Sequence, residues 1–133
     1  MKILVIHGPN MNLIGIRSKN DGTTITLNKI NSHLKKIAQK DNITLKILQT
    51  HSQTKANKFL HSNRNSANGL LLVPNTWNQY GYTIKDTIEL IEIPFINIQF
   101  KKTDSIFKNN VYDKDIIKSF SYAFQKLYKI ISQ

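Results

Sequence analysis

Lys2–His7 reads KILVIH, an almost continuous apolar run that Gly8 and Pro9 bring to an end. A short apolar run bounded by turn residues is typical of a strand buried on both faces of a parallel sheet. Further along the chain, Gly69–Val73 (GLLLV) repeats the pattern immediately before Pro74. Both segments therefore predict buried strands of a parallel sheet.

Strand and helix patterns alternate along the rest of the chain. Apolar residues spaced by three and four predict a helix over about Thr26–Gln39, with Leu27, Ile30, Leu34 and Ile37 on one stripe. The other expected elements are a strand at Ile43–Gln49, a helix at Ala56, Phe59 and Leu60 that ends before Ser62, a helix marked by Ile84, Ile88 and Ile91, a strand at Phe95–Phe100, a short fifth strand at Ile116 and Ile117, and a closing helix at Tyr122–Ile131. About five strands and four helices in this order predict an α/β fold of the flavodoxin-like, doubly wound type, with a five-stranded parallel sheet and three layers.

Size and composition indicate one flavodoxin-like domain over residues 1–133, with 40% hydrophobic residues. No apolar stretch approaches the roughly 20 residues of a membrane span, and the opening residues lack the pattern of a secretory signal. We therefore expect a cytoplasmic protein without a membrane partner. The absence of cysteine excludes disulfides, thiolate nucleophiles and cysteine-based metal sites.

The formal net charge of +11 arises from 19 basic and 8 acidic residues. Such an imbalance can indicate an anionic partner such as nucleic acid. However, the lysines are scattered singly or in pairs, and arginine, the residue preferred for base and phosphate contacts, is rare. The chain is also rich in lysine, asparagine and isoleucine, as drift in an AT-rich coding sequence would produce. We favour that explanation over nucleic-acid binding.

In a doubly wound sheet, the ligand site lies beyond the carboxyl ends of the strands. The segments that follow the expected strands are the places to look for functional side chains. These segments are His7–Arg17, Gln49–Gln53, Pro74–Tyr82 and Gln99–Lys108.

The most specific of them is His7–Arg17, which reads HGPNMNLIGIR. It resembles the loop after the first strand in the type II 3-dehydroquinate dehydratases; from residue types alone, it would equally be an asparagine- and glycine-rich turn capping a helix. Supporting matches occur at Thr26-Leu27, Gln49-Thr50, Pro74, Lys85-Asp86 and Ile93–Ile96. The resemblance covers nearly the whole chain and is weak after Gln99.

The resemblance implies a lyase of the shikimate pathway of aromatic amino acid biosynthesis, which dehydrates 3-dehydroquinate to 3-dehydroshikimate. It implies no cofactor and no metal, a small anionic carboxylate substrate, and a homo-oligomer, a dodecamer built from trimers. In this family a tyrosinate near an arginine removes a proton beside the ketone, a water on an asparagine holds the enolate, and a histidine protonates the departing hydroxyl. This is general acid–base catalysis.

Carried over by position, Arg17 matches the family arginine and Asn12 the asparagine of the enolate water, and both are present. Gln99 stands at the position of the catalytic histidine. The resemblance further implies substrate-binding positions at Asn10, Gln79, Asp86, Phe100, Lys101 and Lys108.

The two groups that move protons in the family have no counterpart in this sequence. The tyrosine is expected five residues after Arg17, where Ser18–Gly22 offers Asp21 or Gly22 instead. Gln99 and Gln79 replace two histidines, and an amide does not titrate. Further departures are Val73 for a substrate-binding asparagine, Gln53 for a glutamate and Ser119–Ser121 for a glycine-rich stretch.

Tyrosines and histidines elsewhere in the sequence are candidates to replace these groups. Tyr80 and Tyr82 follow the third strand, although rim or subunit-contact aromatics are the better interpretation. His7 and His51 end or follow strands and so are candidates to face the pocket, whereas His33 and His61 fall in expected helices. The histidines show no metal-ligand spacing. The sequence leaves two hypotheses: a dehydratase with impaired or rerouted activity, or a non-catalytic family member that binds another anion or nucleic acid.

Overall fold

A computed structural model describes all residues, 1–133. Five strands form one sheet in the order β2-β1-β3-β4-β5, and every neighbouring pair is parallel. The strands are β1 (Lys2–His7), β2 (Thr44–Gln49), β3 (Gly69–Val73), β4 (Phe95–Gln99) and β5 (Asn110–Tyr112). The predicted parallel, doubly wound α/β fold is confirmed.

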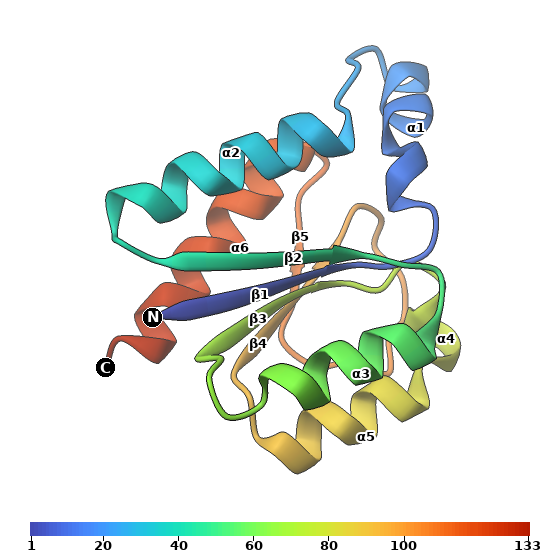
Figure 1. Cartoon of the computed structure of the whole chain (residues 1–133). Coiled ribbons are helices and arrows are strands. Elements are labelled where there is room, and N and C mark those ends of the chain that lie inside the picture. The colour runs from blue at the N-terminus through green and yellow to red at the C-terminus, as the bar shows by residue number, and fades with distance from the viewer.

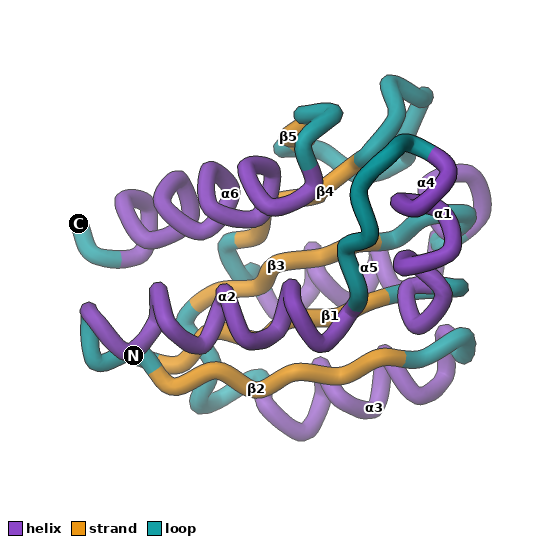
Figure 2. The backbone as a smooth tube through the Cα atoms, turned by 90° about the horizontal axis from the view of Figure 1, so that it is seen from above, coloured by secondary structure: helices purple, strands orange, loops and turns teal.

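Helices cover both faces of the sheet, which gives three layers (Figure 1). They are the 3-10 helix η1 (Met11–Leu13), α1 (Ile14–Asn20), α2 (Leu27–Lys40), α3 (Gln53–Asn63), α4 (Trp77–Tyr80), α5 (Tyr82–Ile91) and α6 (Ile116–Ile131). Figure 2 shows α2 and α6 on one face, α3 and α5 on the other, and the short α1 and α4 together at one end of the strands. No helix has both the length and the apolar character needed to cross a membrane.

The core consists of two apolar layers, one on each side of the sheet. Successive residues of β1 alternate between them: Ile3 and Val5 pack with α2 and α6, whereas Leu4 and Ile6 pack with α3 and α5. All four side chains are fully buried. This two-sided burial explains why β1 and β3 appear in the sequence as continuous apolar runs.

The prediction of a fifth strand at Ile116 and Ile117 is wrong, because these residues form the first turn of α6. The Asp115 side chain accepts a hydrogen bond from the backbone N–H of Lys118 at 3.1 Å and so caps the helix there. The real β5 is three residues long and buries only Val111, so its sequence carries no strand pattern.

The helix count was also too low, since the structure contains six α-helices rather than four. The loop expected after β1 contains η1 and α1, and the loop expected after β3 contains α4. α1 has only seven residues, too few to show a helical period in the sequence, and α4 is a single turn. Elsewhere the bounds differ slightly: β2 begins at Thr44, β4 ends at Gln99 and α3 extends to Asn63.

Candidate functional site

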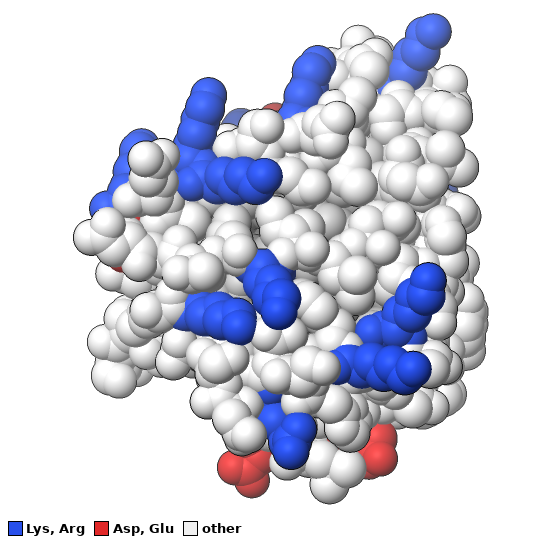
Figure 3. All heavy atoms as spheres, viewed as in Figure 1, with Lys and Arg blue, Asp and Glu red and all other residues white.

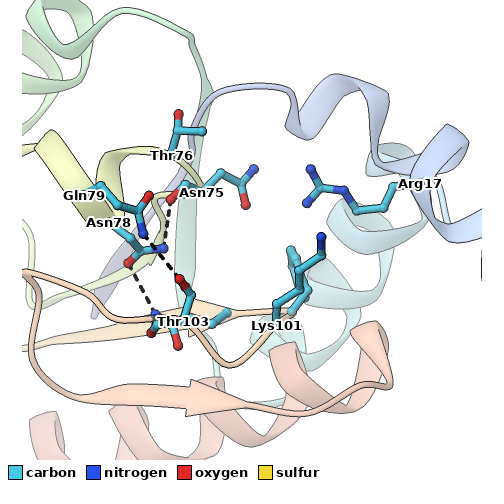
Figure 4. A pocket seen from close by; sticks show the side chains of 9 residues that line it. Arg17, Asn75, Thr76, Asn78, Gln79, Lys101 and Thr103 are labelled. Atoms are coloured by element: carbon cyan, nitrogen blue, oxygen red, sulfur yellow. Dashed lines mark hydrogen bonds between the residues drawn. The ribbon is translucent and has the colours of Figure 1, made fainter.

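A cavity of about 280 Å³ lies at the carboxyl ends of the central strands, where α1, α4 and the loop after β4 meet (Figure 4). This is where doubly wound sheets place their ligands. Nine residues line it: Arg17, Asn75, Thr76, Asn78, Gln79, Gln99, Phe100, Lys101 and Thr103. They come from α1, from the segment after β3, from the last residue of β4 and from the loop that follows it.

The turn after β1 positions α1 at the carboxyl ends of the strands. The backbone N–H of Gly8 donates to the carbonyl of Val73 at 2.8 Å, and a Cβ at this position would lie 2.7 Å from the same oxygen. Only glycine allows this close approach of the two backbones. Asn10 then adopts a left-handed conformation with φ 67°, and its N–H donates to Nδ1 of His51 at 3.2 Å. The turn thereby directs α1, and with it Arg17, over the strand ends.

Amide side chains form the wall of the cavity opposite α1. Oδ1 of Asn78 accepts from Nδ2 of Asn97 at 3.1 Å and from Nε2 of Gln99 at 3.4 Å. Gln99 also donates to the carbonyl of Thr103 at 3.2 Å, which ties the loop after β4 to the end of that strand. Asn78 and Gln99 are both buried, so water does not compete with the hydrogen bonds that hold this wall together.

Replacing Asn78 with alanine is expected to lower the free energy of unfolding by about 2 kcal/mol, because Asn97 and Gln99 each lose one of their acceptors and the hydroxyl of Ser105 loses the acceptor to which it donates. Urea denaturation measures this change. The matched control is Gln79→Ala, since Gln79 is exposed on the same short helix and should cost no more than about 0.5 kcal/mol. Equal losses in the two variants would show that the Asn78 hydrogen bonds do not stabilise the wall.

The only charged groups of the cavity are Arg17 and Lys101. Figure 4 shows both side chains extending into the same open space, with the guanidinium of Arg17 facing Asn75. Neither cation takes part in a hydrogen bond to a side chain or in an ion pair; the one ion pair of the molecule joins Lys85 and Glu89. The cavity is therefore positively charged and has no internal counterion.

Five of the residues expected from the sequence come together in this cavity: Arg17, Gln79, Gln99, Phe100 and Lys101. Asn10 and Asn12 belong to the turn and 3-10 helix before α1 and do not line it. Asp86 lies exposed on α5. Lys108 lines a different cavity of about 150 Å³, together with the Lys85–Glu89 pair.

No tyrosine and no histidine lines the cavity. Tyr80 is exposed and bonded through its hydroxyl to Oγ1 of Thr76 at 3.0 Å, and Tyr82 is also exposed. His51 accepts a hydrogen bond from the turn after β1, as described above. His33 and His61 lie on α2 and α3, as expected.

His7 points away from the cavity into the core beneath α2 and α6. It is fully buried, with Nε2 2.9 Å from Oδ1 of Asn31 and its ring 5.8 Å from that of Phe120. Desolvation by burial lowers the pKa of His7 to about 4, although the hydrogen bond to Asn31 opposes this. His7 is therefore a neutral core residue at ordinary pH.

Sequence reasoning missed Asn75, Thr76, Asn78 and Thr103. All four lie in segments that the strand pattern had marked as following β3 and β4. No periodicity or motif distinguishes one polar residue from its neighbours in such loops, so the signal identified the segments and not the side chains.

Comparison with known proteins gives a consistent result. A family model described as Dehydroquinase class II matches residues 1–124. A 3-dehydroquinate dehydratase of Caldanaerobacter subterraneus is 35% identical over 97 residues, which cover 73% of this chain and 66% of that protein. A 3-dehydroquinate dehydratase of Buchnera aphidicola is 31% identical over 122 residues, which cover 92% of this chain and 76% of that protein.

Solved structures show the same fold. The type II dehydroquinase from Butyrivibrio crossotus superposes with a TM-score of 0.85 at 21% identity, covering 96% of this chain and 97% of that one. A 3-dehydroquinate dehydratase-like protein from Bifidobacterium longum superposes with a TM-score of 0.76 at 12% identity, covering 100% and 99%. At these identities, the likeness concerns the fold.

Proposed function

Because this chain belongs to the class II dehydroquinase family, we propose that it is a 3-dehydroquinate dehydratase-like protein of the shikimate pathway whose own dehydratase turnover is strongly impaired. The substrate would be 3-dehydroquinate and the product 3-dehydroshikimate, as the names of the relatives suggest. The proposal concerns the cavity at the strand ends.

The observation that carries the proposal is the composition of that cavity. It holds a guanidinium, an ammonium, amides and hydroxyls, but no phenol, imidazole or carboxylate. Dehydration of 3-dehydroquinate requires a base for the proton beside the ketone and an acid for the departing hydroxyl. An amide such as Gln99 donates and accepts hydrogen bonds without exchanging a proton. Substrate binding is therefore supported better than proton transfer.

We assign roles to the expected residues on this basis. Arg17 would bind the anionic substrate or stabilise developing negative charge, and Gln99 would orient the leaving hydroxyl. Asn12 and Asn10 lie outside the cavity lining, and the role of holding the water of the enolate is what the family resemblance implies for Asn12. Gln79, Phe100 and Lys101 would complete the substrate site, which needs no cofactor.

Asp86 and Lys108 lie outside this cavity in a single chain. They would reach a substrate only across a subunit boundary. A role of Asp86 and Lys108 in binding substrate therefore requires the dodecamer that the family resemblance implies, whereas the roles of the other residues do not.

The expected loss of rate follows from the two missing proton-transfer groups. Each such group typically contributes about 10²–10⁴-fold. Groups that work as a unit are less than additive, so the combined loss would be at least that of one group, about 10²-fold, and at most the independent product of about 10⁸-fold.

A second candidate function is a non-catalytic member that binds another anion. It is favoured by the two cations of the cavity, which have no counterion. Nucleic acid is a weaker choice of anion: Figure 3 shows lysine and arginine side chains spread over the visible face, with uncharged surface between them. A nucleic-acid binder of this charge should lose affinity steeply with salt, and an isotherm indifferent to salt would exclude it.

Any dehydration catalysed by this protein is expected to disappear on replacing Arg17 with glutamine, because the cavity then lacks the guanidinium that would bind the substrate. The measurement follows the ultraviolet absorbance of the conjugated enone product at high protein concentration. Lys19→Gln is the matched control, since Lys19 is an exposed cation on the same helix and does not line the cavity. Activity that survives Arg17→Gln undiminished would arise elsewhere and would contradict the assigned site.

A further inference from the structure

The two cations of the cavity reach it from different elements. Arg17 extends from α1, whereas Lys101 extends from the loop that follows β4. In Figure 4 the guanidinium and the ammonium group enter the same space from one side, opposite the amides after β3. With no acidic residue among the nine that line the cavity, these two side chains give it a formal charge of +2.

The rest of the wall is uncharged, and part of its donor capacity is already used within the protein. The side-chain nitrogens of its amides already donate to protein oxygens: Asn75 to the carbonyl of Pro9 at 2.7 Å, Asn78 to the carbonyl of Asn75 at 2.9 Å, Gln79 to the carbonyl of Asp104 at 3.0 Å and Gln99 to the carbonyl of Thr103 at 3.2 Å. These bonds fix the amides in place. The attraction for an anion therefore comes chiefly from Arg17 and Lys101.

Two like charges that share a small cavity repel each other until an anion enters. A ligand with a single negative charge, such as 3-dehydroquinate with its one carboxylate, leaves one of the two cations uncompensated. A ligand with two negative charges neutralises both. The volume of about 280 Å³ is at the lower end for ligand sites, which restricts the ligand to a small molecule.

We propose that the cavity selects small dianions, either a phosphate group or a dicarboxylate, over monocarboxylates of similar size. The inference rests on the proposed function, since it takes the same cavity as the ligand site, and it adds the charge of the ligand. The guanidinium of Arg17 offers a planar pair of donors, and the ammonium of Lys101 adds a mobile point charge. The chain thus keeps an anion receptor where its family performs proton transfer.

The test compares inorganic phosphate, succinate and acetate by isothermal titration calorimetry with the full chain at matched ionic strength. At about pH 8, phosphate and succinate each carry close to two negative charges and acetate carries one. At least one dianion is expected to bind about fivefold or more tightly than acetate, because it meets a second cation. If only phosphate binds, the cavity prefers a ligand with both charges on one group; if only succinate binds, it prefers two separate carboxylates. Either result supports selection of a dianion.

Arg17→Gln and Lys101→Gln are each expected to weaken dianion binding about three- to tenfold while changing acetate binding less. The control Lys19→Gln should bind all three ions as the unmodified chain does, since Lys19 lies outside the cavity. All three positions are exposed, and thermal unfolding without ligand checks that each variant folds.

Acetate binding as tight as that of both dianions would overturn the proposal, as would the absence of dianion binding or an equal effect of Lys19→Gln. None of these results depends on turnover of 3-dehydroquinate. Rapid turnover would instead contradict the impaired activity proposed above and leave the comparison of charges intact. The two proposals can therefore fail separately.

Discussion

Introducing a phenol and an imidazole at the cavity, through Asp21→Tyr combined with Gln99→His, is expected to raise the rate of 3-dehydroquinate dehydration by at least about a hundredfold. The phenol would supply the base beside Arg17, and the imidazole would supply the acid for the leaving hydroxyl. An imidazole titrates near neutral pH, whereas the amide of Gln99 does not titrate.

The local geometry favours these two positions. Asp21 is the residue directly after α1, four positions beyond Arg17, and this spacing places side chains on one side of a helix. Gly22 is the less suitable site, because its φ of 96° would strain a tyrosine. Gln99 already lines the cavity and donates to the carbonyl of Thr103, a bond that an imidazole N–H can replace.

The matched control is Asp21→Phe combined with Gln99→His, which keeps the ring and lacks the hydroxyl. It is expected to recover far less activity than the variant with tyrosine. The enone absorbance of the product measures all three proteins. Equal rates in the tyrosine variant, the phenylalanine variant and the unmodified chain would show that a missing base does not limit the reaction.

Acidification is expected to destabilise the fold by about 3 kcal/mol through His7 alone, because its pKa falls from 6.5 in the unfolded chain to about 4 in the folded one. Between these values the unfolded state binds a proton that the folded state does not. The stability due to His7 is therefore complete above pH 6.5 and is lost as the pH falls toward 4. In the folded protein, Nε2 of His7 has Oδ1 of Asn31 as its partner, whereas Nδ1 is buried without one. A proton added at Nδ1 would therefore find no acceptor.

Urea midpoints measured over this pH range test the prediction. In His7→Asn, the part of the pH dependence that belongs to His7 should be absent. His61→Gln is the control, because His61 is exposed on α3 and should leave the pH dependence unchanged. A pH dependence that is the same in His7→Asn and the unmodified chain would show that His7 does not hold this role.

The sequence predicted the parts of the fold in which burial dictates residue type. β1 and β3 are buried on both faces, so their continuous apolar runs identified them. β5 shows no such run, because only Val111 of its three residues is buried. It is a strand because it pairs with β4, a contact that the local sequence does not reveal. Ile116 and Ile117 had the β-branched character of a strand, yet the cap at Asp115 makes them helical.

The candidate site was predicted in part. The segment HGPNMNLIGIR identified Arg17, and the position of Gln99 at the end of β4 identified the opposite wall. Asn75 and Asn78 escaped notice because their roles depend on a left-handed turn and on hydrogen bonds to distant residues. Lys108 was grouped with the substrate site by resemblance, while the fold places it at another cavity.

The cavity at the strand ends contains the guanidinium of Arg17 and no phenol, imidazole or carboxylate that could transfer a proton. The most direct test is the rate at which the purified chain forms 3-dehydroshikimate from saturating 3-dehydroquinate, measured beside a relative that carries both the tyrosine and the histidine. We expect a rate at least about 10²-fold below that of the relative. A rate within about tenfold of the relative, abolished by Arg17→Gln, would contradict the claim.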